Sequence, residues 1–490
     1  MLIRKANQMV KRCMGRLGIL SYVLLVLTLL NISCGDQFND NIDNPVKEDN
    51  NMLVQAINQN CKYVLTEWWN SPKDISFQRS NLLYYEPLTE AQQDEVNKSI
   101  ESFANWNNEE YLLIPNWQKN IYSENAILPS CYASRILSSA IHYGIYDERI
   151  TGVSREEALK KAILLISSLA KYHCSNSENG WGNCWQGALW AEMLGMSALL
   201  IKSNLSSDSW NMVCNMIRSE CNYVMQEAKV TIYKDRDGNV CPGRSGDSQA
   251  ETDAWNATIF ALAMAAIPND GDLNMWRKSF IEFNLTAMAC PSDVFSEKSI
   301  DGYSLTNITG SNINEDGTVT NHGRLHIDYM ASPIESFAES AIALSFANGG
   351  SSYDCLKFNV DKVYTALVDL DLGEFEPSKA GHHFYERTGN GEATSDTNMP
   401  EDNDWGNNVR QANYYLVDIY TSLIGADISL PDELKADKWA YCRLVKIRQM
   451  MERDNSGRIY QDGEEYFASG QLYAMACLTQ VYSLLNGNIN

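Results

Sequence analysis

Apolar residues recur with a period near 3.6 along most of the chain from residue 52 onward, which is the pattern of amphipathic helices rather than strands. Between Leu159 and Leu169 the apolar positions form one helical stripe, and Ser154 with Glu157 forms a capping-box sequence before it. Ser332-Pro333 with Glu335 repeats this start signal, with proline in the first helical position. Twelve helices are predicted, near residues 52–70, 130–144, 154–173, 183–202, 207–227, 251–267, 273–289, 332–348, 353–370, 407–425, 432–452 and 466–486.

The connections between the predicted helices alternate in length. Those after even-numbered helices are short, whereas most of those after odd-numbered helices are long, such as 71–129, 290–331 and 371–406. Antiparallel neighbours with this alternation would place the long loops together at one end of the domain. We therefore expect an all-α fold, an (α/α)6 toroid of about twelve helices. A superhelical solenoid is the alternative, but no sequence repeat of fixed period supports one.

The first fifty residues have the pattern of an export signal. Residues 1–17 carry five basic residues and no acidic one, and an apolar stretch follows from 18 to 32. The stretch ends in Asn31-Ile-Ser-Cys34, which resembles a bacterial lipoprotein signal, although leucine is usual where Asn31 stands. An ordinary secretory signal and a retained membrane anchor are the alternatives. We expect a signal peptide at 1–33, lipid on Cys34, a tether at 34–50, and a single catalytic domain at 51–490.

The composition is that of a folded, acidic protein. Of 490 residues 44% are hydrophobic, and the net charge of −23 becomes −28 once residues 1–33 are removed. Such a chain lacks the basic surface that binds phosphates, so nucleic acid is excluded as a partner. Contact with a membrane is expected through the lipid anchor only, with the outer membrane as the expected location.

Cysteine spacing and known fingerprints exclude several classes of site. Eleven cysteines follow Cys34 without a CxxC pair or a Cys/His cluster, so no metal site is predicted. Most of these cysteines fit small core positions, and one or two disulfides are an open alternative. No phosphate-binding or dinucleotide-binding fingerprint is present, and no cofactor is predicted.

Polar and aromatic residues gather in the long loops and in the first turns of the helices that follow them. Trp rings there could stack on sugar faces, and amide, carboxylate and guanidinium groups could bind hydroxyl groups and carboxylates. The predicted substrate-binding residues are Asn183, Trp185, Trp255, His326, His382, His383 and Trp405. An anionic substrate also needs a local positive charge, for which the candidates are Arg244, Arg324, Arg387 and Arg410.

The segment from Asp316 to Tyr329 is the richest in chemistry, with two histidines, an arginine and a tyrosine within eight residues. Its Asp-Gly-Thr-Val sequence, followed by His322 and then a tyrosine, resembles a stretch of α/α-toroid polysaccharide lyases of the chondroitin AC and heparinase type. Asn183-Cys-Trp-Gln186 is similar to the Asn-Trp motif of the same families. The toroidal β-glucuronidases of polysaccharide-degrading gut bacteria fit the lipoprotein context equally well.

The lyase resemblance implies β-elimination at a uronic acid of an acidic polysaccharide, with His322 as the base and Tyr329 as the acid. The carboxylate next to the abstracted proton must be neutralised, because its charge makes that carbon a poor acid. We assign this role from the residues themselves to Arg324 and Asn256, with Asn183 in reserve.

Hydrolysis is the alternative reaction, and it requires two carboxyl groups across the scissile bond. Glu251 or Asp253 could supply one of them, and Asp402 or Asp404 the other, since both segments open helices at the loop-rich end. Acidic residues are also common in first helical turns for reasons of helix stability alone. A non-catalytic glycan-binding lipoprotein is the third hypothesis.

Overall fold

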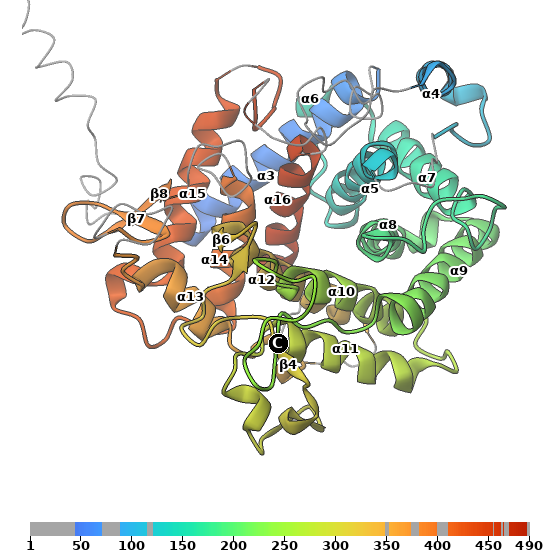
Figure 1. Ribbon diagram of the computed structural model, residues 1–490. Helices are drawn as coiled ribbons and strands as arrows, with labels where there is room; N and C mark the ends of the chain where they lie inside the picture. Colours follow the sequence, from blue (N-terminus) through green and yellow to red (C-terminus); the bar gives the residue numbers. More distant parts are fainter. Residues whose placement is uncertain are drawn as a thin grey trace, which may run out of the picture. The chain divides into compact units, whose positions relative to one another are not determined.

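The fold of the described residues is predominantly helical in this computed structural model, with 61% of residues in helices and a few short strands (Figure 1). The structure describes residues 45–70, 89–114, 121–347, 352–373, 382–398, 410–453, 455–461, 464 and 470–487. Fourteen α-helices lie in these ranges: α3 (Pro45–Tyr63), α4 (Glu90–Ala104), α5 (Ile121–His142), α6 (Glu148–Thr151), α7 (Arg155–Lys171), α8 (Gly187–Leu200), α9 (Ser207–Tyr223), α10 (Ala250–Ala266), α11 (Leu273–Ala287), α12 (Ile327–Ser345), α13 (Val360–Asp369), α14 (Gln411–Leu423), α15 (Ala436–Met451) and α16 (Gly470–Asn486).

Each of the twelve predicted helices overlaps one helix of the structure, and α4 and α6 are additional. The predicted cap at Ser154 is confirmed, because its side chain accepts a hydrogen bond from the Glu157 backbone N–H at 3.2 Å. The predicted start of α12 at Ser332 is wrong. The helix begins five residues earlier, where His326 is the N-cap and accepts from the Asp328 N–H, and Pro333 lies inside the helix.

Six helices, which we call the core helices, contact one another in a closed order. Helix α5 packs on α8, α8 on α10, α10 on α12, α12 on α14, α14 on α16, and α16 returns to α5. In Figure 1 these helices can be followed in this order by their colours, from teal α5 to red α16. Helix α10 is buried along nearly its whole length, because α8, α11 and α12 all pack against it.

The intervening helices pack against the core helices. Helix α7 lies against α5 and α9, α9 against α8 and α10, α11 against α10, and α15 against α14. Helix α7 buries one face and exposes the other, which matches its amphipathic sequence. The segment Val46–Asn490 forms one compact unit by its internal contacts.

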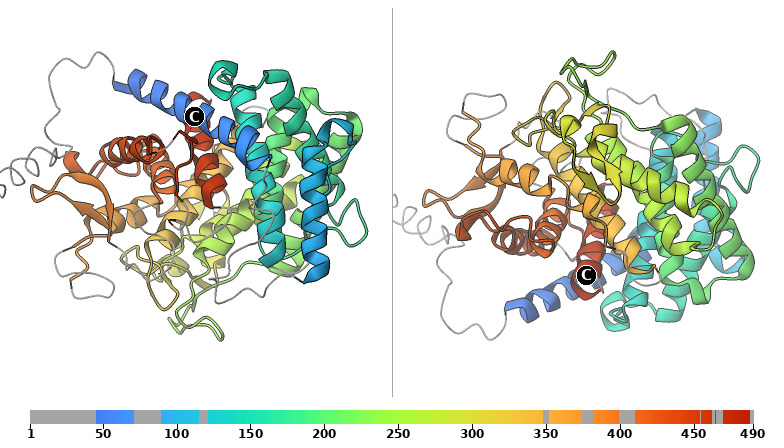
Figure 2. Two further views of the ribbon diagram at one scale, coloured as in Figure 1. Left: turned by 90° about the horizontal axis from the view of Figure 1, so that it is seen from above. Right: turned by 90° about the horizontal axis from the view of Figure 1, so that it is seen from below.

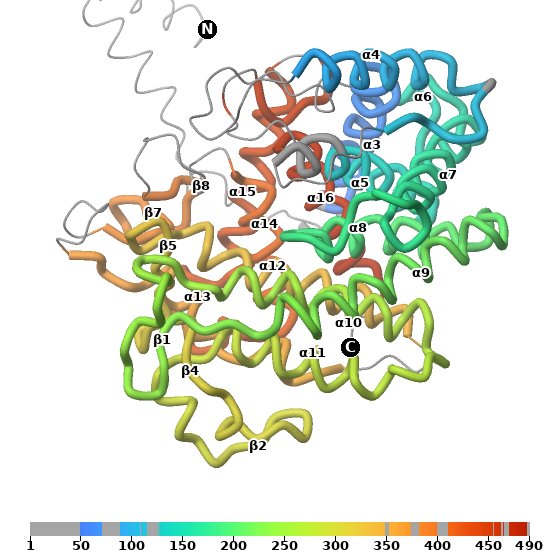
Figure 3. The backbone as a smooth tube through the Cα atoms, turned by 45° about the vertical axis from the view of Figure 1, so that its right-hand side comes forward, coloured from blue at the N-terminus to red at the C-terminus, as the bar shows by residue number. Residues whose placement is uncertain are grey.

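The strands form four antiparallel two-stranded pairs, all in the long loops that precede core helices. The pairs are β1 (Lys234–Asp235) with β4 (Gly310–Ser311), β2 (Ser299–Ile300) with β3 (Tyr303–Ser304), β5 (Thr320–Asn321) with β6 (Arg324–Leu325), and β7 (Tyr385–Arg387) with β8 (Ala393–Thr397). In both views of Figure 2 the green loop before α10 projects beyond the helices. Figure 3 shows β1, β4 and β5 close together beside the ends of the helices.

The N-terminal predictions lie outside the described residues, including the signal peptide, Cys34 and most of the tether. Among the helices that the structure describes, none combines the length and the apolar character needed to cross a bilayer. The eleven cysteines after Cys34 are all free thiols, and most are buried, so they occupy small apolar positions in the core.

Candidate functional site

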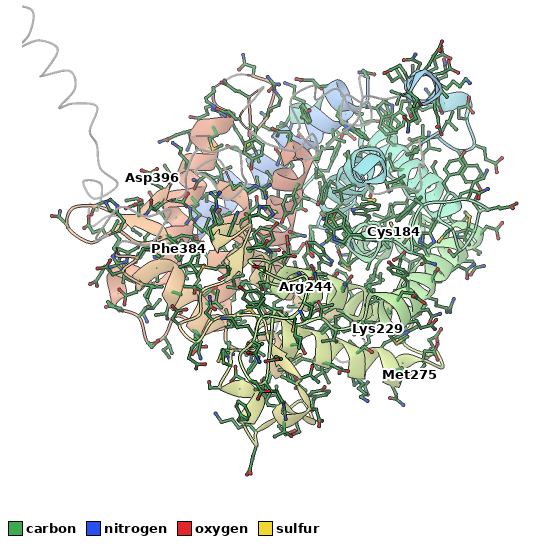
Figure 4. All side chains as sticks on the ribbon, viewed as in Figure 1. Cys184, Lys229, Arg244, Met275, Phe384 and Asp396 are labelled. Carbon is green, nitrogen blue, oxygen red and sulfur yellow. The ribbon has the colours of Figure 1, made fainter. Side chains whose placement is uncertain are left out.

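A cavity of about 400 Å³ opens where the long loops meet the first turns of α10 and α12. Its wall comes from the loop before α8, the loop before α10, the β5–β6 hairpin and the starts of both helices. Figure 4 labels Cys184 and Arg244, which belong to two of these loops. The lining residues are Cys184, Trp185, Gln186, Tyr223, Ala228, Thr231, Arg244, Asp247, Ser248, Gln249, Glu251, Thr252, Trp255, Asn256, Asn321, His322 and Tyr329.

His322 is held in the cavity wall by the turn of the β5–β6 hairpin. Asn321 pairs with Arg324, so His322 and Gly323 form a two-residue turn, and both have positive φ angles, +50° and +75°. This is the conformation of a type I′ hairpin turn, which is unusual for histidine. The Asn321 side chain supports the turn, because its Oδ1 accepts from the His322 backbone N–H at 2.7 Å. A strained residue held in this way is typical of functional sites.

The hairpin is fixed to the loop before α10. The Gly323 N–H donates to the Gly246 carbonyl at 2.9 Å, and the Ser248 N–H donates to the Thr320 carbonyl, also at 2.9 Å. A Cβ atom on Gly246 would lie 2.8 Å from the Cα of Gly323, so the two backbones approach too closely for any other residue at position 246. The position of His322 therefore depends on a segment more than seventy residues away in the sequence.

His322 and Tyr329 form a direct pair in the cavity wall. The Tyr329 hydroxyl lies 3.1 Å from the His322 Nε2, and Tyr329 projects from the first turn of α12. His326 packs behind them, with its ring edge-on to Tyr329 at 4.8 Å between centroids. His326 is fully buried and its Nδ1 caps α12, so the structure places it as a support of the pair and not in the cavity wall.

Two tryptophans form an aromatic edge of the cavity. Trp185 is 51% exposed, and its ring meets the buried ring of Trp255 edge-on at 6.1 Å. The loop that carries Trp185 is held by Glu220, whose Oε1 accepts from the Asn183 backbone N–H at 2.6 Å and contacts the His173 Nε2 at 2.9 Å. Although burial lowers the pKa of His173, its hydrogen bonds outweigh that effect and raise it to about 9.

The two acidic residues predicted at the start of α10 have different positions. Glu251 lines the cavity, and its Oε1 accepts from the Ser332 hydroxyl at 3.4 Å. Burial and the nearby carboxylates of Asp328 and Glu335 raise the pKa of Glu251 well above its usual range. Asp253 is fully buried and is not among the lining residues. It accepts from the backbone N–H and the hydroxyl of Thr231, which ties the preceding loop to α10.

Asn312, which the sequence analysis missed, joins three segments around the cavity. Its Oδ1 accepts from the backbone N–H groups of Tyr233 and Gln249, and its Nδ2 donates to the carbonyls of Thr231 and Thr286. These partners are 26 to 81 residues away in the sequence, so no local motif marks this asparagine. Its contacts could be found only in three dimensions.

Of the four candidate arginines, only Arg244 is among the described residues that line the cavity. Arg410 is buried and lies 3.6 Å from the Asp328 carboxylate, below the first turn of α12. Arg387 donates to the Val368 carbonyl and pairs with Asp369 at the β7–β8 hairpin. Arg324 belongs to β6 but does not line the cavity.

The remaining candidates lie elsewhere or outside the described residues. Asn183 is held in the Trp185 loop and does not line the cavity. His382 contacts Glu386 at 2.7 Å and His383 contacts the Leu370 carbonyl at 2.9 Å. Both lie in the segment of Phe384, which Figure 4 shows well apart from Cys184 and Arg244. Asp402, Asp404 and Trp405 lie outside the described residues.

A second polar region, the interior carboxylate cluster of Glu192, Glu335 and Glu339, lies on the core helices α8 and α12. Tyr473 donates a hydrogen bond to Glu335, and the Gln480 amide donates to Glu339 at 2.7 Å. Burial is the main cause that raises the pKa of Glu335 to about 8 and that of Glu339 to about 7. The cluster thus holds carboxyl groups that titrate near neutral pH.

No protein-family model, curated protein or solved structure matches this chain. Within the described residues, no group of three or more His, Cys, Asp or Glu side chains is placed to hold a metal ion. The function is therefore inferred from the chemistry of the cavity itself.

Proposed function

We propose that this protein is an exported, lipid-anchored enzyme with an (α/α)6 toroid fold that cleaves uronic acid polysaccharides by β-elimination. The closed order of contacts among the six core helices supports the toroid. The observation that carries the reaction is the pairing of His322 with Tyr329 in the wall of a cavity that also holds tryptophan, amide and arginine side chains. Attachment to the outer membrane through Cys34 is part of the same proposal.

The pair has the groups that elimination needs. His322 Nε2 takes the proton from the carbon next to the uronate carboxyl group, and the Tyr329 hydroxyl gives its proton to the departing 4-linked oxygen. The carbon–oxygen bond breaks as the double bond of the unsaturated uronate forms. Because the two side chains lie 3.1 Å apart, the imidazolium proton can then return to the tyrosinate, which restores the pair without outside help.

The uronate carboxylate must be neutralised while the proton leaves. Arg324 and Asn256 were expected in this role from the sequence, but Arg324 does not line the cavity, and its lining residues favour Asn256 together with Arg244. The guanidinium of Arg244 can bind a carboxylate through two parallel hydrogen bonds, and the Asn256 amide can donate another. Trp185 and Trp255 offer flat apolar faces to the sugar ring.

Hydrolysis is a second candidate reaction, because Glu251 and Asp247 line the same cavity. A carboxyl group with a raised pKa, as in Glu251, is suited to protonate a leaving oxygen. In this alternative Asp247 would be the second carboxylate, and His322 and Tyr329 would only bind the substrate. The two reactions leave different products, so one experiment separates them.

The test is to incubate the purified protein with a panel of uronic acid polysaccharides while following the absorbance of the unsaturated uronate and the release of reducing ends. We expect both signals to rise, and His322→Ala and Tyr329→Phe to remove both. His383→Ala, a histidine away from the cavity, is the matched control and should retain activity. Reducing ends without the absorbance would establish hydrolysis, and binding without either signal would establish a glycan-binding protein.

A further inference from the structure

The cavity wall contains few charged residues, and these include both basic and acidic side chains. Among the described lining residues, Arg244 is the one with a fixed positive charge, whereas Asp247 and Glu251 are acidic, and burial raises the pKa of Glu251. His322 adds a positive charge only when it is protonated. A wall of this kind can neutralise one anionic group of a bound sugar, and it offers no second fixed cation for another.

The single cation is already close to a carboxylate. The Arg244 Nη1 lies 3.8 Å from the Asp247 Oδ2, and the Arg244 side chain is one-third exposed. At this distance the ion pair is loose, so an incoming carboxylate can engage the free edge of the guanidinium. A further anion nearby would meet the carboxylate of Asp247 and would be repelled.

The rest of the wall suits neutral parts of a sugar. It presents aromatic rings such as Trp185, amide groups such as Gln186 and Asn256, and hydroxyl groups such as Thr252. Amides and hydroxyls bind sugar hydroxyl groups, and aromatic rings stack on C–H faces. A sulfate group among such residues would lose its hydration without gaining a cationic partner, which is costly.

We propose, on the basis of the proposed function, that the cavity selects unsulfated uronic acid polysaccharides, in which one uronate carboxylate binds Arg244 and the adjoining sugar bears hydroxyl groups. Asp247 acts as the specificity residue that disfavours sulfated chains. Selection therefore depends on repulsion as well as on attraction, as in many specific binding sites.

The test uses matched polymers that differ only in sulfate. Unsulfated chondroitin and chondroitin 4-sulfate form one pair, and N-acetylheparosan and its chemically O-sulfated derivative form a second. Binding is measured by tryptophan fluorescence at fixed ionic strength, in parallel with the absorbance assay. We expect the unsulfated member of at least one pair to bind at least tenfold more tightly. Equal or tighter binding of both sulfated members, or no binding of any unsulfated polymer, would overturn the proposal.

Variants of the wall residues Asp247 and Arg244 test the role given to each of them. Asp247→Asn removes the repulsion at nearly constant size and should narrow the preference for the unsulfated chain at least threefold. Arg244→Ala should weaken binding of the uronate polymer about tenfold but leave binding of its carboxyl-reduced form unchanged. Arg149→Ala, an exposed arginine paired with Asp147, is the control and should change neither ratio. An unchanged preference in Asp247→Asn would exclude the role given to that residue.

The two proposals fail in different ways. If no polymer yields the unsaturated product, elimination is excluded, and the binding ratios still decide the specificity. If elimination is seen but the sulfated member of each pair reacts and binds best, the specificity proposal is wrong while the reaction stands.

Discussion

The cavity wall and the interior carboxylate cluster are both rich in polar groups, but they are built in opposite ways. The cavity wall comes mainly from loops, and its key histidine is held with a positive φ by the β5–β6 turn. The cluster comes from helices, and Glu335 and Glu339 have partners on α16, Tyr473 and Gln480. Loops can present strained and accessible groups to a ligand, whereas polar groups on facing helices are shielded from a ligand and can hydrogen-bond to one another. The comparison predicts that substitutions in the wall change activity and those in the cluster change stability.

Two tyrosines provide the largest expected contrast. Tyr329→Phe removes the proposed acid from the cavity, and we expect kcat to fall about 10³-fold with little change in Tm. Tyr473→Phe removes the donor to buried Glu335, and we expect a loss of about 1 to 3 kcal/mol in the free energy of unfolding with kcat nearly unchanged. The measurements are the unsaturated uronate absorbance and thermal unfolding of both variants. If the two substitutions had similar effects on kcat and on stability, the proposed division between an active cavity wall and a stabilising cluster would be wrong.

The difference in pH dependence between the native chain and a Glu335 variant tests the cluster, because buried groups elsewhere, such as Glu251 and Asp253, also have raised pKa values. Because the pKa of Glu335 is raised to about 8 in the folded protein, the folded state keeps a proton that the unfolded chain has already lost. Stability should therefore fall as the pH rises from about 4.5 to 8 and should level off above that range. Glu335→Gln lacks this loss, so at pH 9 we expect it to be more stable than the native chain by about 5 kcal/mol.

Urea unfolding at pH 4.5, 7 and 9 measures this difference. The gap between Glu335→Gln and the native chain should be smallest at pH 4.5 and should widen with pH. Glu433→Gln, on the exposed surface, is the control and should follow the native curve. A constant gap at all three values of pH would show that Glu335 does not titrate in this way.

The support of the cavity wall can be tested with two glycines that share a left-handed conformation. Gly246 has φ +70° and faces the backbone of Gly323, whereas Gly238 has φ +83° and open space around it. Both alanine substitutions carry the conformational cost, but only Gly246→Ala must displace the hairpin that holds His322. We expect kcat to fall about tenfold to thirtyfold in Gly246→Ala and to stay near the native value in Gly238→Ala. Equal kcat values in the elimination assay would contradict the role of this contact.

The helices were predictable because each buries a stripe of apolar residues that recurs with the helical period. Helix α4 was missed because it has few apolar residues, although Thr89 and Gln92 form a full capping box that marks its start. The early start of α12 was missed because its cap is a histidine, a residue outside the usual set of N-caps. The order in which the core helices contact one another depends on packing across the whole chain.

The site was predictable only in part. Trp185, Glu251, Trp255, Asn256, His322 and Tyr329 were all candidates, and the structure places all six around one cavity. They could be chosen from the sequence because they are polar or aromatic residues at the ends of long loops. Asp253 and His326 have the same character but serve the fold, and only their hydrogen bonds to Thr231 and Asp328 reveal this. Glu335 was expected only as part of a helix start signal and Glu339 was not considered, because an acidic residue within a helical pattern is usually assigned to the solvated face.

The smallest expected effect concerns the aromatic edge of the cavity. Trp185 is half exposed and meets Trp255 edge-on, so its loss should remove a stacking surface without disturbing the core. We expect Trp185→Ala to raise KM about fivefold, which corresponds to about 1 kcal/mol, with kcat unchanged. Steady-state kinetics on the preferred polymer measures the split between KM and kcat. The control is Tyr441→Ala, which removes a comparably exposed aromatic ring on α15 and should leave both KM and kcat unchanged. A fall in kcat for Trp185→Ala would instead place the Trp185 ring beside the reacting bond.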